Sequence, residues 1–237
     1  MKRLLIGVSA VLICAWTAYA APIVAVDIGD DGGSMSGAGV LAPVGSTWNV
    51  IAGTSGSGLL DTEGKATGVG FVGDGFSTGD NVAGTVNDLI DDSRVGQNPT
   101  GVTSPGGVSR FFALTITGLT VAEKHDLVLY GAQNFGHGRG TVWTVYSGAT
   151  YGPTVSMGTS DASDFTNGGF VENSTYIRLQ VCTDENGSLR IFGDNEDTDP
   201  RYINTAFLNG FEIQQVPEPT ALGLGALGLL LLRRRRR

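Results

Sequence analysis

The sequence predicts an all-β protein, a two-sheet sandwich of the jelly-roll type with long glycine-rich loops. Between Ala21 and Val216 no segment keeps a helical period for more than two turns. What recurs instead is short β-branched and aromatic segments, separated by Gly, Asn, Asp and Ser, which is typical of sandwiches. Fewer than 200 residues lie between these two positions, which is the length of one domain.

Nine segments are predicted as strands because they combine β-branched or aromatic residues with turn residues at their ends. They are Ile23–Ile28, Thr47–Ala52, Gly68–Val72, Val108–Thr117, Asp126–Gln133, Thr141–Ser147, Thr175–Cys182, Leu189–Phe192 and Ala206–Gln214. Only Thr85–Asp92 has a short helical pattern, and three long loops are expected at Asp30–Gly39, Gly53–Gly58 and Asn98–Gly107.

Alternation along three of these strands predicts which side chains face the core, because successive residues of a strand point to opposite faces. The expected core residues are Phe112, Leu114, Ile116, Ile177, Leu179, Val181, Phe211 and Ile213, whereas Tyr176, Arg178 and Gln180 share an opposite face. Cys182 is expected to pack as a small strand residue, since it is the one cysteine left once Cys14 is removed with the N-terminal segment.

The first 20 residues have the three parts of a secretory signal peptide. Lys2 and Arg3 form the positive region, and Leu4–Ala15 is the apolar region. Ala18 and Ala20 form an A-x-A cleavage site, so the exported chain is expected to begin at Ala21.

The C-terminus has the features of a membrane-targeting tail. Pro217, Glu218 and Pro219 precede an apolar run, and the chain closes with Arg233, Arg234, Arg235, Arg236 and Arg237. A helix over Thr220–Leu232 would measure about 20 Å at ~1.5 Å per residue, short of the ~30 Å bilayer core. The arginines should stay on the cytoplasmic side. The run therefore indicates a provisional anchor, held until the chain is cut near the two prolines.

This order of a Pro-Glu-Pro motif, an apolar stretch and terminal arginines resembles the PEP-CTERM sorting signal of Gram-negative bacteria. The resemblance covers about a tenth of the chain. It implies export, transient anchoring in the inner membrane, and processing by an exosortase-type membrane enzyme before release to the envelope or surface. The expected organisation is thus residues 1–20 as signal peptide, 21–214 as sandwich and 215–237 as sorting tail.

Charge restricts the partners of the exported body. Of 15 basic residues, two lie in the signal peptide and five in the tail, whereas 22 of 23 acidic residues remain in the body. The resulting net charge near −14 argues against nucleic acid or anionic lipid as a partner of the body.

A second resemblance concerns the body. Val26–Gly29 reads V-D-I-G, Trp48–Asn49 reads W-N, and Leu114–Thr120, Asp126–Gly131 and Phe207–Ile213 follow in order. Together they resemble the galactose-binding-like or malectin-like sandwiches of exported proteins. That resemblance implies a jelly roll whose loops often bind sugars, sometimes beside a structural calcium.

Candidate chemistry is sparse. Both histidines, His125 and His137, lie in predicted turns, where His125 is expected to be exposed, and neither has the context of a triad or zinc site. No G-x-S-x-G elbow occurs, so no catalytic residue is assigned and a secreted hydrolase is the least favoured function.

Two binding sites are considered. A sugar site needs an aromatic ring with hydrogen-bonding neighbours, and the candidates are Asn134, His137, Arg139, Trp143, Tyr146 and Tyr151, with Trp143 equally compatible with a core position. A structural calcium would use Asp194, Asp197 and Asp199, although a solvated acidic loop explains the same run. No other cofactor is expected.

The sequence thus favours an exported, non-catalytic β-sandwich with a structural or adhesive role beside extracellular polysaccharide. The alternative is a dedicated carbohydrate-binding module. A concave face lined by Trp143 and Tyr146 would favour the module.

Overall fold

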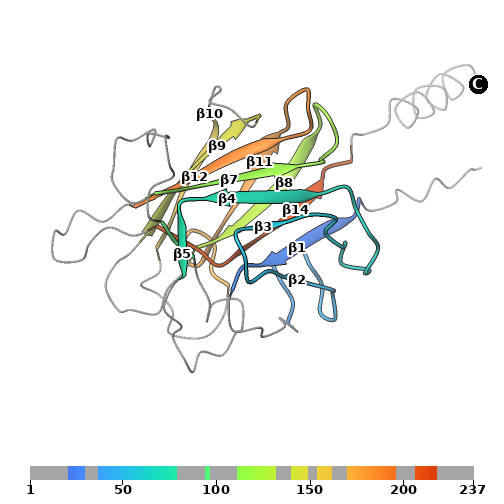
Figure 1. Ribbon diagram of the computed structural model, residues 1–237, viewed down its shortest axis with the longest axis horizontal. Helices are drawn as coiled ribbons and strands as arrows, with labels where there is room; N and C mark the ends of the chain where they lie inside the picture. Colours follow the sequence, from blue (N-terminus) through green and yellow to red (C-terminus); the bar gives the residue numbers. More distant parts are fainter. Residues whose placement is uncertain are drawn as a thin grey trace, which may run out of the picture.

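The computed structural model describes residues 21–29, 37–78, 94–96, 111–131, 140–148, 154–161, 170–195 and 206–217. These residues form strands and turns, with no helix among them, and two main sheets pack face to face (Figure 1). The prediction of an all-β, two-sheet sandwich is confirmed. The predicted helix at Thr85–Asp92 lies outside the described residues.

The first sheet has five strands in the order β11-β8-β14-β1-β2. All neighbours are antiparallel except β1 and β2, which pair in parallel. The bounds are β1 Ile23–Asp27, β2 Asn49–Val50, β8 Lys124–Tyr130, β11 Tyr176–Cys182 and β14 Gly210–Gln215.

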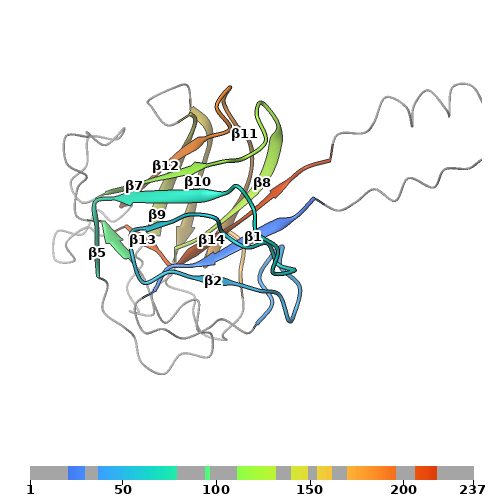
Figure 2. The ribbon, with the colours of Figure 1, turned by 45° about the vertical axis from the view of Figure 1, so that its right-hand side comes forward.

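The second sheet has six strands in the order β10-β9-β12-β7-β4-β3, all antiparallel. The bounds are β3 Ser55–Gly56, β4 Gly70–Asp74, β7 Phe112–Thr117, β9 Gly140–Ser147, β10 Thr154–Asp161 and β12 Leu189–Asn195. A small third sheet joins β13 (Phe207–Leu208), β6 (Arg94–Gly96) and β5 (Phe76–Thr78). Figure 2 shows β4, β7 and β12 crossing over β1 and β14 of the five-stranded sheet.

The core lies between the two main sheets and confirms the predicted alternation. Phe112, Leu114 and Ile116 of β7 are completely buried, and Ile177, Leu179 and Val181 of β11 are buried as well. Phe211 and Ile213 of β14 join them, with the Phe211 ring packed edge-on against Phe71 at 5.6 Å between centroids. Burial of this continuous apolar layer is the main term that stabilises the sandwich.

Two residues differ from their predicted environments. His125 is only 2% exposed, because it shares the inward face of β8 with Leu127 and Leu129. Cys182 is exposed, because it follows the inward-facing Val181 and therefore points away from the core. The predictions of an exposed His125 and a packed Cys182 are both wrong.

The motifs singled out in the sequence have structural roles. The Asn49 amide donates to the carbonyls of Ala25 and Leu60 at 2.9 and 2.8 Å and accepts the Leu60 amide N–H at 2.8 Å. It therefore joins β1 to the loop that follows β3. Trp48 packs on the outer face of the five-stranded sheet, where its ring lies 6.4 Å from that of Tyr130.

Candidate functional site

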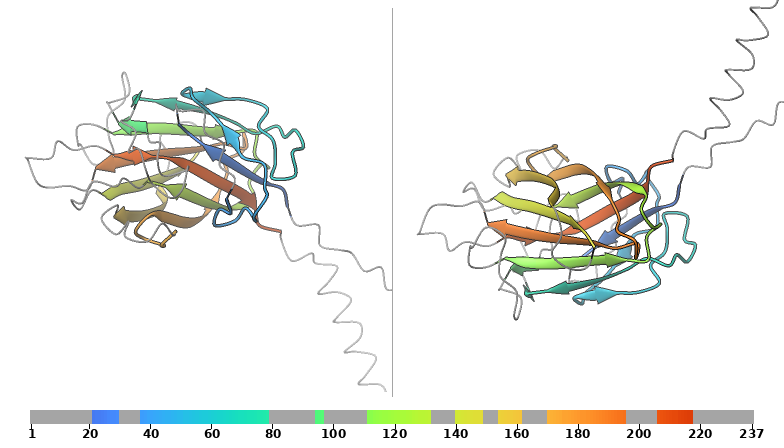
Figure 3. Two further views of the ribbon diagram at one scale, coloured as in Figure 1. Left: turned by 90° about the horizontal axis from the view of Figure 1, so that it is seen from below. Right: turned by 90° about the horizontal axis from the view of Figure 1, so that it is seen from above.

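Both ends of the described body leave at one end of the sandwich, here called the terminal pole. Ile23 at the start of β1 pairs with Gln214 near the end of β14, and the Gln214 side-chain amide donates to the Ala21 carbonyl at 2.9 Å. Figure 3 shows the two strands side by side at this end in both views. The Val216 amide still donates to the Lys124 carbonyl at 2.8 Å, and the exposed Pro217 follows. Since proline has no backbone N–H, Pro217 cannot extend this ladder.

An open groove of about 610 Å³ lies at the terminal pole. Its walls come from the first residues of the body, from the turn Pro43–Ser46 and from the turn around Asp61. The Asp61 carboxylate accepts the amide N–H groups of Glu63 and Lys65 at 2.9 and 2.8 Å, which holds that turn in place. The groove has no aromatic lining, so it offers no ring on which a sugar could stack.

A second cavity of about 160 Å³ opens between the sheets near the same pole and contains His125. Its Nδ1 lies 3.1 Å from the Glu123 carbonyl, which can only accept, so Nδ1 is the donor. Burial lowers the pKa of His125, which favours the neutral ring.

His125 and Cys182 lie on adjacent strands but do not form a nucleophile–base pair. In the register of β8 and β11, His125 is opposite Val181, and Cys182 is opposite Lys124. Consecutive residues point to opposite faces, so His125 turns inward and Cys182 outward. A thiol activated by an imidazole needs the two side chains within hydrogen-bond reach, and this register separates them.

A buried carboxylate, Glu212, lies in the centre of β14. It is 0% exposed, and its two oxygens accept the amide N–H groups of Leu41 at 2.7 Å and Ala42 at 3.0 Å. The Tyr130 hydroxyl also donates to Glu212 and accepts the Val40 amide at 2.9 Å. We call Glu212, Tyr130 and the backbone of residues 39–42 the carboxylate clamp.

The carboxylate clamp explains why the pKa values of its two side chains move. Burial raises the pKa of Glu212, and the hydrogen bonds from Leu41, Ala42 and Tyr130 partly oppose that shift. Burial and the neighbouring Glu212 charge raise the pKa of Tyr130. Neither described cavity is lined by Glu212, and a Cβ on Gly39 would collide with its carboxylate oxygen. The carboxylate clamp therefore has a structural role: its hydrogen bonds hold the loop of residues 39–42 on the outer face of the five-stranded sheet.

The sequence did not single out Glu212. Alternation between Phe211 and Ile213 places it on the outer face, where a carboxylate is normally solvated. Its backbone partners are 170 and 171 residues away in the chain, so no local pattern points to them.

The two described aromatic candidates for sugar binding, Trp143 and Tyr146, do not lie on one surface. Trp143 is completely buried in the core, where its ring packs edge-on against Phe112 at 5.6 Å. Tyr146 is 7% exposed and lies on the outer face of the same sheet, against Phe192 at 5.5 Å. The two rings therefore point to opposite sides of β9, and Trp143 cannot stack on a ligand. Asn134, His137, Arg139 and Tyr151 lie outside the described residues.

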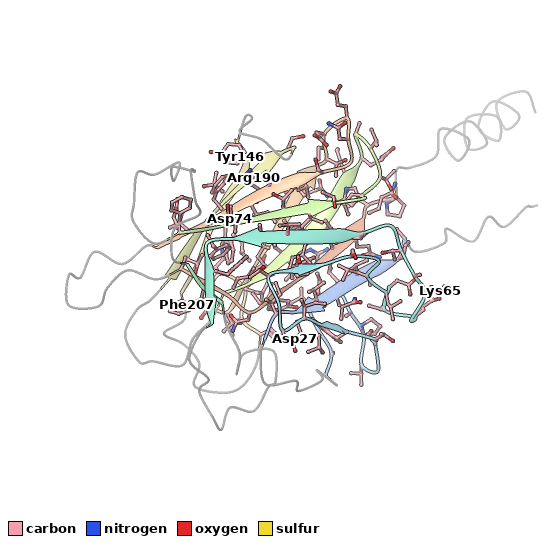
Figure 4. All side chains as sticks on the ribbon, viewed as in Figure 1. Asp27, Lys65, Asp74, Tyr146, Arg190 and Phe207 are labelled. Carbon is pink, nitrogen blue, oxygen red and sulfur yellow. The ribbon has the colours of Figure 1, made fainter. Side chains whose placement is uncertain are left out.

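The outer face around Tyr146 contains a charged residue that the sequence did not suggest. Arg190 is opposite Tyr146 in the register of β12 and β9, and its guanidinium carbon lies 5.2 Å from the centroid of the Phe192 ring. Figure 4 shows Tyr146 and Arg190 next to each other, far from Lys65 at the terminal pole. This cation–π contact covers the aromatic face on the outside of the sheet.

The calcium candidate is described at one residue only. Asp194 is 5% exposed near the end of β12, opposite Val142 of β9. Asp197 and Asp199 lie outside the described residues. Within the part of the chain that the structure describes, no group of three or more His, Cys, Asp or Glu side chains is arranged to hold a metal ion.

The residues predicted to direct sorting are described only where they adjoin the sandwich. Ala21 and Pro217 lie at the terminal pole, as given above. The structure does not describe Ala18, Ala20, Glu218, Pro219, Arg233, Arg234, Arg235, Arg236 or Arg237. Among the described residues there is no helix long and apolar enough to cross a membrane.

No family model matches the sequence, and no curated protein matches it. Similar solved structures include the ANX2 ectodomain from Arabidopsis thaliana, at 16% identity and a TM-score of 0.43, covering 84% of this chain and 50% of that chain. The ANXUR1 extracellular domain from the same plant gives 14% identity and a TM-score of 0.40, with coverages of 84% and 49%. A complex of the plant peptide RALF23 with FER and LLG2 is similar at 15% identity and a TM-score of 0.42, covering 83% of this chain and 49% of that chain. The chain spans about half the length of these matched chains.

Proposed function

We propose that this chain is an exported, non-catalytic β-sandwich protein that a PEP-CTERM tail sorts to the bacterial envelope. Its role there is structural or adhesive, beside extracellular polysaccharide. The observation that carries the proposal is the terminal pole, where Ala21 and Pro217 leave the body together. A signal peptide and a sorting tail can then be cut at one end without disturbing a strand.

The position of Pro217 supports this division of the chain. The last backbone hydrogen bond of the body is that of Val216 to Lys124, and the Pro-Glu-Pro motif begins at the next residue. A processing enzyme needs an extended, accessible backbone, and a proline that follows the last strand provides one. Removal of everything after Pro217 would leave all the described strands intact.

The opposite end of the sandwich is the one a tethered molecule would present outward. β1, β4 and β8 start at the terminal pole and run away from it, whereas β14 and β7 end there, as the antiparallel registers of β1 with β14, of β14 with β8 and of β4 with β7 require. A surface role beside polysaccharide would use this end.

A dedicated carbohydrate-binding module is the second candidate and receives less support. Such a module would need a face shared by Trp143 and Tyr146, but the two side chains lie on opposite sides of their sheet. Saturable affinity of the purified body for one defined glycan would favour the module over a structural role.

Variants of the arginine block test the sorting proposal in a host that carries an exosortase. With Arg233–Arg237 replaced by glutamine, the tail loses the charge that orients it, and we expect the chain to remain unprocessed. The matched control replaces the same residues by lysine, which retains the charge. Processing that continues in the glutamine variant as in the lysine variant would contradict the proposal.

A further inference from the structure

Two large apolar side chains are exposed at the terminal pole. Val44 is 82% exposed in the turn Pro43–Ser46, and Val121 is 51% exposed in the turn Gly118–Glu123. Both turns adjoin the end of β14. Val44 shares the groove with Ala21 and Gln214, and the hydroxyl of Thr120, next to Val121, donates to the Gln215 side-chain oxygen at 2.9 Å. The two valines therefore flank the place where the chain enters and leaves the body.

Membrane-seeking sequence lies close to this pole on both sides. The apolar run of the tail begins at Ala221, four residues after Pro217, and the run Leu4–Ala15 ends six residues before Ala21. At ~3.5 Å per residue, Pro217 can stand at most about 14 Å from the first apolar residue of the tail. This step rests on the proposed function, because it takes the tail as a membrane segment.

Charge at the pole indicates the kind of membrane contact. Lys65 and Glu63 form an exposed ion pair at 2.5 Å, so their charges offset each other. Glu123 precedes Lys124, and Glu185 lies in the β11–β12 turn. With no excess of basic residues among these groups, the pole has no electrostatic attraction for anionic lipid. An apolar contact with zwitterionic headgroups fits this surface better.

We infer that, while the chain is tethered, its terminal pole rests on the phospholipid surface. The turns Pro43–Ser46 and Gly118–Glu123 contact the headgroup layer, and Val44 and Val121 reach into the interface. This contact fixes the orientation of the sandwich and points its opposite end away from the membrane.

Single-cysteine labelling tests this orientation. The background is the full chain with Cys14→Ser and Cys182→Ser, the two cysteines of the sequence. Val44→Cys and Val121→Cys each receive a polarity-sensitive fluorophore, and the protein is reconstituted into phosphatidylcholine vesicles. The control is Val171→Cys, because Val171 is 50% exposed, which matches Val121.

The control site lies at the other end of the sandwich. The Thr175 amide donates to the Val171 carbonyl at 2.8 Å, and the Gly131 amide, just past the end of β8, donates to the Thr175 carbonyl at 3.4 Å. Val171 therefore stands at the end of β8 that is remote from Lys124, and a label there should remain in water.

The expected result is a blue shift at positions 44 and 121 on reconstitution, with quenching by a headgroup-level lipid quencher, and no change at 171. The shift should persist in high salt, since charge does not drive the contact. Equal responses at all three sites, or none at 44 and 121, would overturn the inference.

Vesicle flotation separates this inference from the proposed function. A chain that floats without a blue shift at 44 and 121 is anchored in the membrane, but its terminal pole does not contact the lipid surface. In that case the inference fails and the proposed function stands. A chain that does not float has no membrane segment, and then the proposed tail anchoring fails with it.

Discussion

Replacing Glu212 by alanine tests how far the carboxylate clamp stabilises the fold. The substitution removes the acceptor for the amide N–H groups of Leu41 and Ala42 and for the Tyr130 hydroxyl. Each buried donor left without a partner costs roughly 1–3 kcal/mol. Release from the cost of burying a carboxylate offsets part of this loss. We therefore expect the free energy of unfolding to fall by about 3 kcal/mol.

The assay is urea unfolding of the wild type and the variant, with the midpoint and slope compared at neutral pH. The control is Gln215→Ala, which removes four heavy side-chain atoms from the same strand, as Glu212→Ala does, but loses only one exposed hydrogen bond to Thr120. That control should cost no more than roughly 0.5 kcal/mol. A Glu212→Ala variant within about 1 kcal/mol of wild type would refute the clamp as a stabilising contact.

Three further outcomes follow. Burial raises the folded-state pKa of Glu212, so between the unfolded and folded pKa values the unfolded state binds fewer protons than the folded state. The free energy of unfolding should therefore fall as pH rises from about 4.3 through the folded pKa. Glu212→Gln should remove this pH dependence in urea unfolding measured at several pH values. Gly118→Ala should lower the free energy of unfolding by at least about 2 kcal/mol and lower the melting temperature with it, because Gly118 has a φ of 75° and a Cβ there would lie 1.9 Å from the Gly68 carbonyl oxygen. An unchanged melting temperature would contradict the turn geometry. Asn49→Ala should cost roughly 2–3 kcal/mol in urea unfolding, at ~1 kcal/mol for each of its three hydrogen bonds, and a neutral effect would show that the amide does not hold β1.

Alternation in the sequence was sufficient to predict most of the core. Phe112, Leu114 and Ile116 follow each other at every second position, and the pleat requires them to share a face. The same rule, applied one residue further, would have placed His125 inward with Leu127. The prediction failed there because His125 was assigned to a turn, and β8 in fact begins at Lys124.

Strand β10 could not be predicted from its own residues. In Thr154–Asp161 only Val155 and Met157 are large and apolar, and Gly158 and Asp161 disfavour a strand, so the local pattern is too short to mark it. It forms a strand because β9 offers a free edge, with which it pairs from Thr154 to Asp161. Such pairing is a tertiary effect that a local pattern does not contain.

The candidate site was less predictable than the fold. Whether Trp143 or Tyr146 faces the core depends on which side of β9 meets the other sheet, and the segment Val142–Tyr146 is apolar or aromatic on both faces. Long-range contacts such as Glu212 with Leu41 likewise depend on the assembled sheet.

The intact mass of the protein recovered from its native host tests the central proposal most directly. We predict a chain that begins at Ala21 and ends near Pro217–Pro219, because both proposed cuts fall at the terminal pole just outside the folded strands. A mass that retains Arg233–Arg237 would mean that the tail is a lasting anchor, and it would contradict sorting by tail removal.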